Sequence, residues 1–218
     1  MLTTVTPRAA TPREDPVPAR TQTERRASSE RTVLDAAAQL IAERGSTKAS
    51  FAEIAAVAGC SHGLPHYLFG SKAKMLDALV AECADQLSER VVAEAVGDTT
   101  GLHALRKVLL TFVRSLEDPW SWTRALYVLL GESLGSAPEL RPALNAYHER
   151  LRVQIRAWIV EGIDAGDVRA DVDPDAAAVV VLGVVRGIGF QVLSDPDLFD
   201  VRTLAREAVG AVDRYLEG

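Results

Sequence analysis

The sequence has few cysteines, few aromatic residues and no segment with the pattern of a strand. Cys60 and Cys83 are the only cysteines, too few for the disulfide framework of a small secreted protein. The N-terminus lacks the charged-then-apolar pattern of a secretory signal, so we expect a cytosolic protein in a reducing compartment. Because apolar and polar residues nowhere alternate with a period of two, β-sheet folds are excluded and an all-α fold is predicted.

What the chain does have is enough apolar sequence for a packed core. Of its 218 residues, 48% are hydrophobic and only 6% are aromatic, which is too apolar for a wholly disordered chain. This length corresponds to one large domain, or to a small domain beside one of ordinary size. Such a chain can bury a core without disulfide bonds.

The acidic charge is unevenly distributed along the chain. Residues 1–78 carry ten Lys and Arg against eight Asp and Glu, whereas residues 79–218 carry fourteen against twenty-two. A mildly basic first third on an acidic remainder is typical of a small nucleic-acid-binding module on a larger body. Many acidic proteins show the same drift, so the charge needs a motif to support it.

The longest apolar run, residues 176–193, contains a single charge, Arg186. Its length is at the lower margin for a helix that spans a bilayer. Arg186 would be costly in hydrocarbon, aspartates flank both ends, and no basic cluster marks a cytoplasmic side. We therefore interpret this run as a helix buried in a bundle or at an oligomer interface of a soluble protein.

Helical periodicity dominates the chain after a proline-rich start. Residues 1–24 have no apolar period and are predicted to form a disordered tail. The predicted helices cover residues 33–44, 51–57, 62–69, 72–96, 100–117, 119–134, 140–163, 174–193 and 198–216. Ser50, Ser61 and Ser71 are the predicted N-caps of the second, third and fourth helices. A glycine ends each of the first four.

Residues 51–69 have the pattern of a helix-turn-helix. Two short helices meet at Gly59, where a glycine permits a turn conformation that a Cβ opposes. Ala55 is small enough to let the two helices approach each other closely. Further residues at positions expected to be buried are Ile54, Ala58, Cys60 and Leu68.

Several motifs resemble one family of regulators. Residues 31–45, 54–63 and 69–72 read RTVLDAAAQLIAERG, IAAVAGCSHG and FGSK, and farther along stand GES at 131–133, PELR at 138–141 and DVDP at 171–174. Together they are similar to the tetracycline-repressor (TetR) family of transcriptional regulators. The resemblance covers nearly the whole chain after residue 24. It implies a helix-turn-helix DNA-binding domain at 25–72 and a larger ligand-binding and dimerisation domain at 73–218.

The second short helix departs from the family pattern at Pro65, His66, Tyr67 and Leu68. His66 stands where the family usually has a phosphate-contacting tyrosine, and Tyr67 follows one position later. Proline removes a backbone donor and either kinks a helix or delays its start. The departure concerns which side chains point into a DNA groove rather than whether the unit binds DNA.

The resemblance also implies which residues contact operator DNA. Lys48, Ser50 and Lys72 are the expected phosphate contacts, with Lys72 aided by the helix N-terminus that it opens. Ser61 either caps its helix or contacts a phosphate. Candidates for positions near bases or phosphates are His62, Leu64, His66 and Tyr67. Arg20, Arg25 and Arg26 are either an arm that reaches the minor groove or solvated charge.

For the larger domain, the family implies a cavity for a small-molecule effector and a dimer interface formed by the last two helices. The candidate cavity residues are Phe112, Trp120, Trp122, Tyr127, Phe190 and Gln191, and ordinary core packing is the alternative for each. Arg186 must be paired because its helix is otherwise apolar. It either faces a carboxylate across the dimer interface, which we favour, or binds an acidic ligand. Gly183, Gly187 and Gly189 allow close helix approach at that interface.

Three other functions have some support in the sequence, namely metal binding, redox sensing and catalysis. His62 and His66 are four residues apart, as zinc ligands on a helix are, but no third ligand is near in sequence. Cys60 is either a redox sensor or, by default, a small core residue. Neither His103 nor His148 lies in a motif for nucleophilic catalysis, so we predict no enzyme, no metal and no cofactor.

The sequence therefore predicts a homodimeric DNA-binding transcriptional regulator, interpreted as a repressor that a small molecule releases from double-stranded operator DNA. Activation instead of repression stays open, because the fold does not determine where the protein binds relative to a promoter. The alternative is a helical small-molecule-binding protein or enzyme whose N-terminal unit no longer binds DNA. Pro65 and His66 are the residues that favour this alternative.

Overall fold

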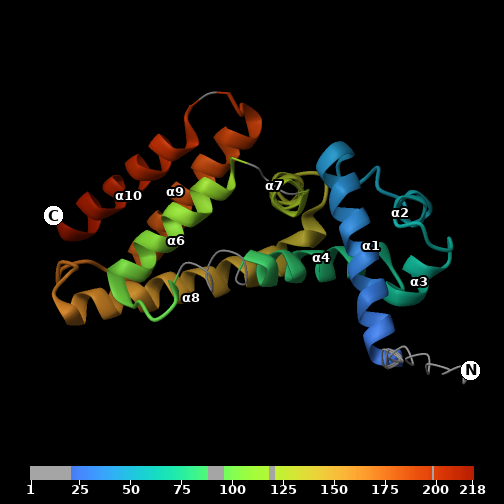
Figure 1. Ribbon diagram of the computed structural model, residues 1–218, viewed down its shortest axis with the longest axis horizontal. Helices are drawn as coiled ribbons and strands as arrows, with labels where there is room; N and C mark the ends of the chain where they lie inside the picture. Colours follow the sequence, from blue (N-terminus) through green and yellow to red (C-terminus); the bar gives the residue numbers. More distant parts are fainter. Residues whose placement is uncertain (1–20, 88–95, 118–120, 198) are drawn as a thin grey trace, which may run out of the picture.

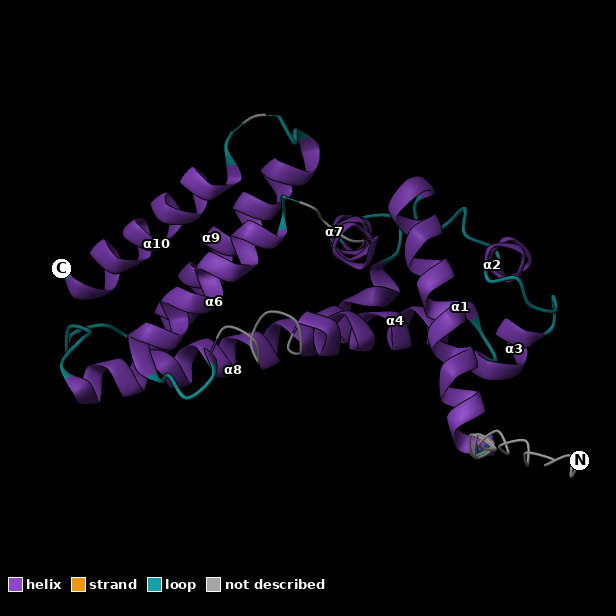
Figure 2. Ribbon diagram, viewed as in Figure 1, coloured by secondary structure: helices purple, strands orange, loops and turns teal. Residues whose placement is uncertain are grey.

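The computed structural model describes residues 21–87, 96–117, 121–197 and 199–218. Within these residues every regular element is a helix and no strand is present (Figure 2). The predicted all-α fold is therefore confirmed. The helices form an elongated molecule with α1, α2 and α3 at one end and α6, α9 and α10 at the other (Figure 1).

The first three helices form the unit in which the helix-turn-helix was predicted, and the fourth follows that unit. They are α1 (Gln22–Arg44), α2 (Phe51–Val57), α3 (Leu64–Phe69) and α4 (Lys72–Leu87). Helix α1 begins inside the segment predicted as a tail, because Thr21 and Glu24 form a reciprocal capping box. Residues 1–20 of that predicted tail lie outside the described residues.

The larger part of the chain is a second group of helices. It comprises α6 (Gly101–Ser115), α7 (Ser121–Ser133), the 3₁₀ turn η2 (Pro138–Leu140), α8 (Arg141–Ala165), α9 (Pro174–Ser194) and α10 (Val201–Glu217). Helix α8 runs along one side of the molecule and connects its two ends, while α7 lies between them (Figure 1). Helices α6, α8, α9 and α10 share one core that includes Leu105, Ile159, Val181 and Leu216.

The core of the N-terminal unit extends across the predicted domain boundary at residue 72. Val33 and Ile41 of α1 belong to the same buried cluster as Leu79 of α4, Leu129 of α7 and Tyr147 of α8. Burial of these apolar side chains stabilises the contact of α1 with α7 and α4. The small N-terminal unit is therefore packed directly onto the larger helical group.

Helix α9 has the length and composition of a membrane-spanning helix. No other helix of the described residues has both. One such helix is weak support for a membrane protein, since buried helices of soluble proteins share this composition. Only a third of its most apolar window is buried within the single chain. Its open face carries Val179, Val180 and Phe190, which are 57%, 45% and 64% exposed, together with the exposed Gly183 and Gly187.

Candidate nucleic-acid interface and effector cavity

The turn between α2 and α3 has the geometry that the sequence predicts, except at its second helix. Ser50 caps α2 in a capping box with Glu53, and Ala55 is fully buried. Gly59 adopts a φ of 63°, which favours glycine. The backbone N–H of Cys60 then donates to the carbonyl of Ala55 at 3.0 Å and closes the turn.

Helix α3 starts later than predicted. The proposed cap at Ser61 is wrong, because α3 begins at Leu64 and Gly63 occupies its N-cap position without a side-chain hydrogen bond. The reason is Pro65, which lies in the first turn of the helix, where a missing N–H costs no helical hydrogen bond. Ser61 contributes its carbonyl oxygen, which accepts the Leu64 N–H at 3.0 Å.

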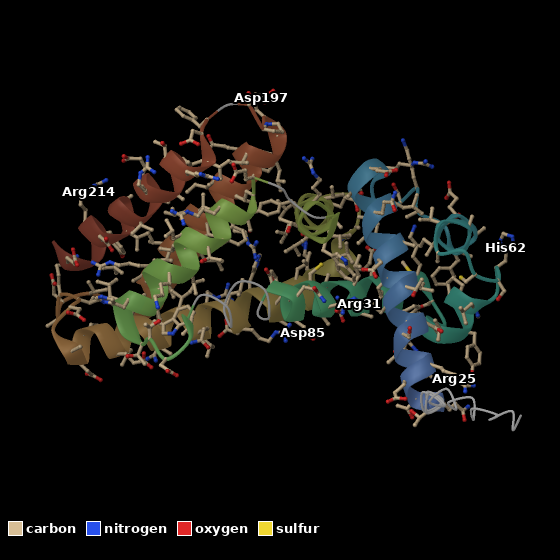
Figure 3. All side chains as sticks on the ribbon, in the orientation of Figure 1. Arg25, Arg31, His62, Asp85, Asp197 and Arg214 are labelled. Atoms are coloured by element: carbon tan, nitrogen blue, oxygen red, sulfur yellow. The ribbon has the colours of Figure 1, made fainter. Side chains whose placement is uncertain are left out.

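The outer surface of α3 consists of polar aromatic side chains. Tyr67 is 75% exposed, His66 is exposed beside the ring of Phe51, and His62 projects from the turn at the edge of the molecule (Figure 3). Leu64 is half-buried and packs against the core, and its predicted contact with the DNA groove stays a prediction. Because His62 precedes the helix, it shares no helix face with His66.

The predicted phosphate contacts flank α3 in the structure. Lys48 is exposed in the loop before α2, and Lys72 at the start of α4 donates from Nζ to the carbonyl of Thr47 at 3.3 Å. Ser71 accepts the Lys74 N–H at 3.3 Å and so caps α4 as predicted. Ser50 remains exposed, but its hydroxyl is already bonded to Glu53 at 2.7 Å.

The predicted arginine arm is only partly within the described residues. Arg25 and Arg26 lie in the first turns of α1, and Arg26 pairs with Glu30 at 2.9 Å. They are therefore helical residues rather than part of an extended arm, because the capping box begins the helix before them. Arg20 lies outside the described residues.

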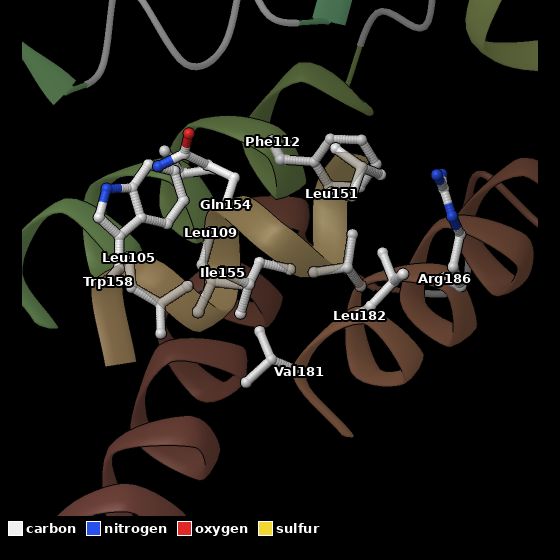
Figure 4. A pocket seen from close by; sticks show the side chains of 12 residues that line it. Leu105, Leu109, Phe112, Leu151, Gln154, Ile155, Trp158, Val181, Leu182 and Arg186 are labelled. Atoms are coloured by element: carbon white, nitrogen blue, oxygen red, sulfur yellow. The ribbon is translucent and has the colours of Figure 1, made fainter. Parts of the chain in front are cut away.

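The larger helical group contains a partly open apolar cavity of about 60 Å³ between α6, α8 and α9 (Figure 4). A smaller cavity of about 20 Å³ adjoins it and is lined by Cys83, Trp122, Tyr127 and Tyr147. Phe112 and Arg186 line both cavities. In Figure 4, Arg186 lies at one end of the larger cavity and Trp158 at the other. The arrangement is a short apolar chamber with one cation at its end.

Arg186 is held by aromatic side chains. Its Nη2 donates to the Tyr147 hydroxyl at 2.7 Å, and its guanidinium lies 5.1 Å from the ring centre of Tyr147 and 5.6 Å from that of Tyr127. Its Nε is buried without a hydrogen-bond partner. Arg186 makes no ion pair among the described residues, and the favoured carboxylate across the dimer interface stays a prediction, because that interface lies outside a single chain.

A second orphaned polar atom lies beside the same tyrosine. His148 follows Tyr147 on α8, their ring centres are 5.5 Å apart, and its Nε2 is buried without a partner. Burial and the positive charge of Arg186 lower the pKa of His148 to about 4, so the imidazole is neutral at pH 7. Burial raises the pKa of the Tyr147 phenol despite the nearby Arg186. Among the residues that the structure describes, the polar end of the cavity therefore carries the charge of Arg186 and no carboxylate paired with it.

The predicted cavity residues divide into three groups. Phe112, Tyr127 and Arg186 line the cavities as expected. Trp122 also lines the smaller one, although its indole N–H donates to Asp35 of α1 at 2.8 Å. Trp120 lies outside the described residues.

Phe190 and Gln191 lie on the exposed face of α9, away from the cavity between α6, α8 and α9, and their role in ligand binding stays a prediction. Phe190 borders a separate, open hollow with Tyr127 and Val128. The cavity wall also contains residues that the sequence did not identify as part of a binding site. They are Leu105, Leu109, Leu151, Ile155, Trp158 and Val181. Their helical spacing was a signal of burial, but the same spacing is produced by core and by cavity wall.

Helix α7 connects the cavity with the helix-turn-helix. Tyr127 faces Arg186 in the middle of this helix, and Glu132 near its end accepts the backbone N–H of Ser46 at 3.0 Å. Ser46 is only 2% exposed and lies in the loop that leads from α1 to α2. A shift of α7 would therefore move the loop that positions α2 and α3.

A helix-turn-helix unit packed on a larger helical group is the architecture of a helical DNA-binding regulator. The family model for bacterial regulatory proteins of the tetR family matches residues 33–79. The model for the C-terminal part of BetI-type transcriptional repressors matches residues 102–218. The chain belongs to the tetR family of bacterial regulatory proteins.

Curated relatives resemble part of the chain. It is 28% identical to the HTH-type transcriptional regulator BetI of Rhizobium meliloti over 122 residues. This match covers 56% of this chain and 60% of the relative. It is 29% identical over 131 residues to the nucleoid occlusion factor SlmA of Sodalis glossinidius, which covers 59% of this chain and 65% of the relative. The chain thus spans somewhat less than two thirds of the length of these relatives.

Solved structures share the fold over most of the chain. A TetR-family transcriptional regulator from Rhodococcus sp. superposes with a TM-score of 0.76 at 24% identity, covering 87% of this chain and 99% of that one. NalD of Pseudomonas aeruginosa, the secondary repressor of the MexAB-OprM multidrug efflux pump, has a TM-score of 0.70 at 23% identity, covering 88% and 98%. At these identities the likeness supports the fold.

Proposed function

We propose that the protein is a cytoplasmic, homodimeric, sequence-specific repressor that leaves its operator when a small molecule enters the larger helical group. The observation that carries the proposal is the exposed surface formed by His62 of the turn and by His66 and Tyr67 of α3. Lys48 in the loop before α2 and Lys72 at the start of α4 flank this surface. Lysines that meet phosphates set affinity and register, whereas side chains on α3 read base edges in the major groove.

The open face of α9 supports the dimer. Val179, Val180 and Phe190 form an apolar stripe with two exposed glycines, and a second copy of the same stripe would bury it through an interface with two-fold symmetry. Such a dimer presents two α3 helices to successive major grooves, which lie about 34–36 Å apart on one side of the duplex.

Release follows from a shift between two populations. The effector must bind better to the conformation in which the two α3 helices are wrongly spaced for successive grooves. A difference in binding free energy of about 2–4 kcal/mol weakens operator binding roughly 30- to 1000-fold. The contact of Glu132 with Ser46 gives α7 a direct connection to the helix-turn-helix.

The likeness to a nucleoid occlusion factor offers nucleoid occlusion as a second candidate function. The match of residues 102–218 to BetI-type repressors favours transcriptional control. Both matched models describe regulators rather than enzymes, and we assign no catalytic residue.

The test is a titration of the purified protein against DNA from upstream of its own gene, followed by genome-derived fragments, at several salt concentrations. We expect tight binding by two protomers that weakens steeply with salt, because phosphate contacts release counterions. Tyr67→Ala and Lys72→Ala should each weaken it, whereas Lys107→Ala, an exposed change on α6, should not.

The rival function, a small-molecule-binding protein that has lost DNA binding, predicts a different result. In that case no genomic fragment binds better than random DNA, and the Tyr67 and Lys72 variants behave like the parent protein. That outcome would reject the repressor.

A further inference from the structure

We propose that the effector is an organic anion, a carboxylate with a short apolar tail, whose head binds Arg186 and whose tail fills the cavity between α6, α8 and α9. This deepens the proposed function. It rests on that function only for the release of DNA, because binding of the anion is measured without DNA.

The charge of Arg186 carries the argument. A buried guanidinium is costly unless an anion and hydrogen-bond acceptors compensate it. Here two neutral phenols surround it, one of its five donors reaches an acceptor in Tyr147, and its Nε has none. A carboxylate would accept from this fork of donors in a planar, paired geometry and would supply the missing charge.

The second orphaned atom favours a polar head at the same place. Nε2 of His148 is buried without a partner, and the ring packs against Tyr147, which Arg186 also contacts. Two unsatisfied polar atoms around one tyrosine are unusual, since most buried polar groups have partners. A ligand head that carries both acceptor and donor capacity, or a carboxylate with an accompanying water, satisfies both.

The rest of the cavity specifies the tail. Apart from Gln154 and Arg186, its wall is formed by apolar side chains, among them Leu105, Leu109 and Val181, with Trp158 at the far end. A cavity of about 60 Å³ holds about four waters by the usual measure of one per roughly 15 Å³. The space therefore fits a tail of about four to six carbons without helix movement. A cationic ligand is disfavoured, because the positive charge of Arg186 would repel it.

The experiment is calorimetric titration of the full-length protein with butyrate, hexanoate, octanoate and phenylacetate, in parallel with hexan-1-ol and hexyltrimethylammonium. We expect hexanoate to bind at least about 30-fold more tightly than hexan-1-ol, because a buried charge-assisted pair is lost with the alcohol. Affinity should rise about fourfold per methylene until the cavity is filled. Quenching or shift of Trp158 fluorescence provides a second readout.

Variants separate binding from folding. Arg186→Met should weaken hexanoate binding at least about 100-fold while leaving hexan-1-ol binding unchanged, and Arg186→Lys should retain part of the affinity. Arg150→Met removes an arginine from the exposed surface of α8 and should bind hexanoate like the parent. If Arg186 were only structural, Arg186→Met would lower the melting temperature of the free protein; a ligand-binding role predicts an unchanged or higher one.

Two outcomes overturn the proposal. One is that hexanoate and hexan-1-ol bind equally, or that hexyltrimethylammonium binds best. The other is that none of the four carboxylates binds. If the carboxylates bind as expected but genomic DNA does not, the anion site stands and the repressor function fails.

Discussion

The contact of Glu132 with the loop before α2 gives the sharpest prediction about how the two parts of the molecule communicate. Glu132→Ala removes the carboxylate that accepts the Ser46 N–H at 3.0 Å. Ser46 is 2% exposed, so water replaces the lost acceptor poorly. Leaving a buried donor unsatisfied costs about 2 kcal/mol, which lowers the melting temperature of a chain of this size by roughly 4–8 °C.

The same substitution should also affect DNA binding, because the loop positions α2 and α3. We expect the affinity for operator DNA to fall about fivefold, equivalent to about 1 kcal/mol. We also expect hexanoate to release a smaller fraction of the variant than of the parent protein from operator DNA. Glu132→Gln keeps an acceptor oxygen and should show less than half of each effect. Glu139→Ala removes an exposed carboxylate from η2 and should change stability by at most about 0.5 kcal/mol.

Thermal unfolding and fluorescence anisotropy with labelled operator measure both effects. If Glu132→Ala melts and binds DNA like the parent protein, the connection through α7 is refuted. If it melts earlier but binds and releases DNA normally, the contact stabilises the fold without transmitting the effector signal.

The remaining predictions concern the polar end of the cavity and its surroundings. A Cβ at Gly189 would lie 1.9 Å from the Tyr127 hydroxyl, so Gly189→Ala should displace that ring, destabilise the protein by about 1–3 kcal/mol and weaken hexanoate binding in calorimetry. The folded pKa of His148 is lowered to about 4, below its unfolded value near 6.5, so its contribution to stability is lost as pH falls from about 6.5 to 4. Since the ring is half-buried, screening by solvent limits this loss of stability to roughly 1–2 kcal/mol. In urea titrations at several pH values, His148→Asn should abolish this pH dependence. An NMR titration that gives His148 a pKa near 6.5 would contradict its burial. Burial raises the pKa of the Cys83 thiol to about 12, so iodoacetamide at pH 8 should label it only in urea, and labelling of the folded protein at the unfolded rate would refute its place in the core.

The sequence predicted the helices and the helix-turn-helix because those features depend on local signals. Ser50 with Glu53 and the glycines at 45, 59 and 70 mark helix ends in any context. The start of α3 was predicted too early in the sequence. Ser61 suggests a cap, but Pro65 determines where the first turn lies. The same proline was identified as the residue that either kinks or delays the helix, and the delay is what occurs.

The cavity was harder to predict because it depends on distant segments. Ile155 and Trp158 on α8 have the spacing of core residues, and only the packing of α6 and α9 around them leaves space. Arg186 was recognised as a charge that needs an explanation, yet its neighbours Tyr127 and Tyr147 come from α7 and α8 and have no link to it in the sequence. Tertiary contacts of this kind decide what surrounds a buried charge, and the spacing of residues in the sequence does not reveal them.

The central claim is that two copies of the chain place α3 in successive major grooves of an operator. Hydroxyl-radical footprinting of the bound upstream fragment, with the mass of the complex measured in parallel, tests it most directly. The account predicts two protected half-sites whose centres are about 10 base pairs apart, or a multiple of this spacing, with two protomers for each pair, and loss of both half-sites in Tyr67→Ala. Uniform protection without half-sites, or protection that Tyr67→Ala leaves intact, would contradict it.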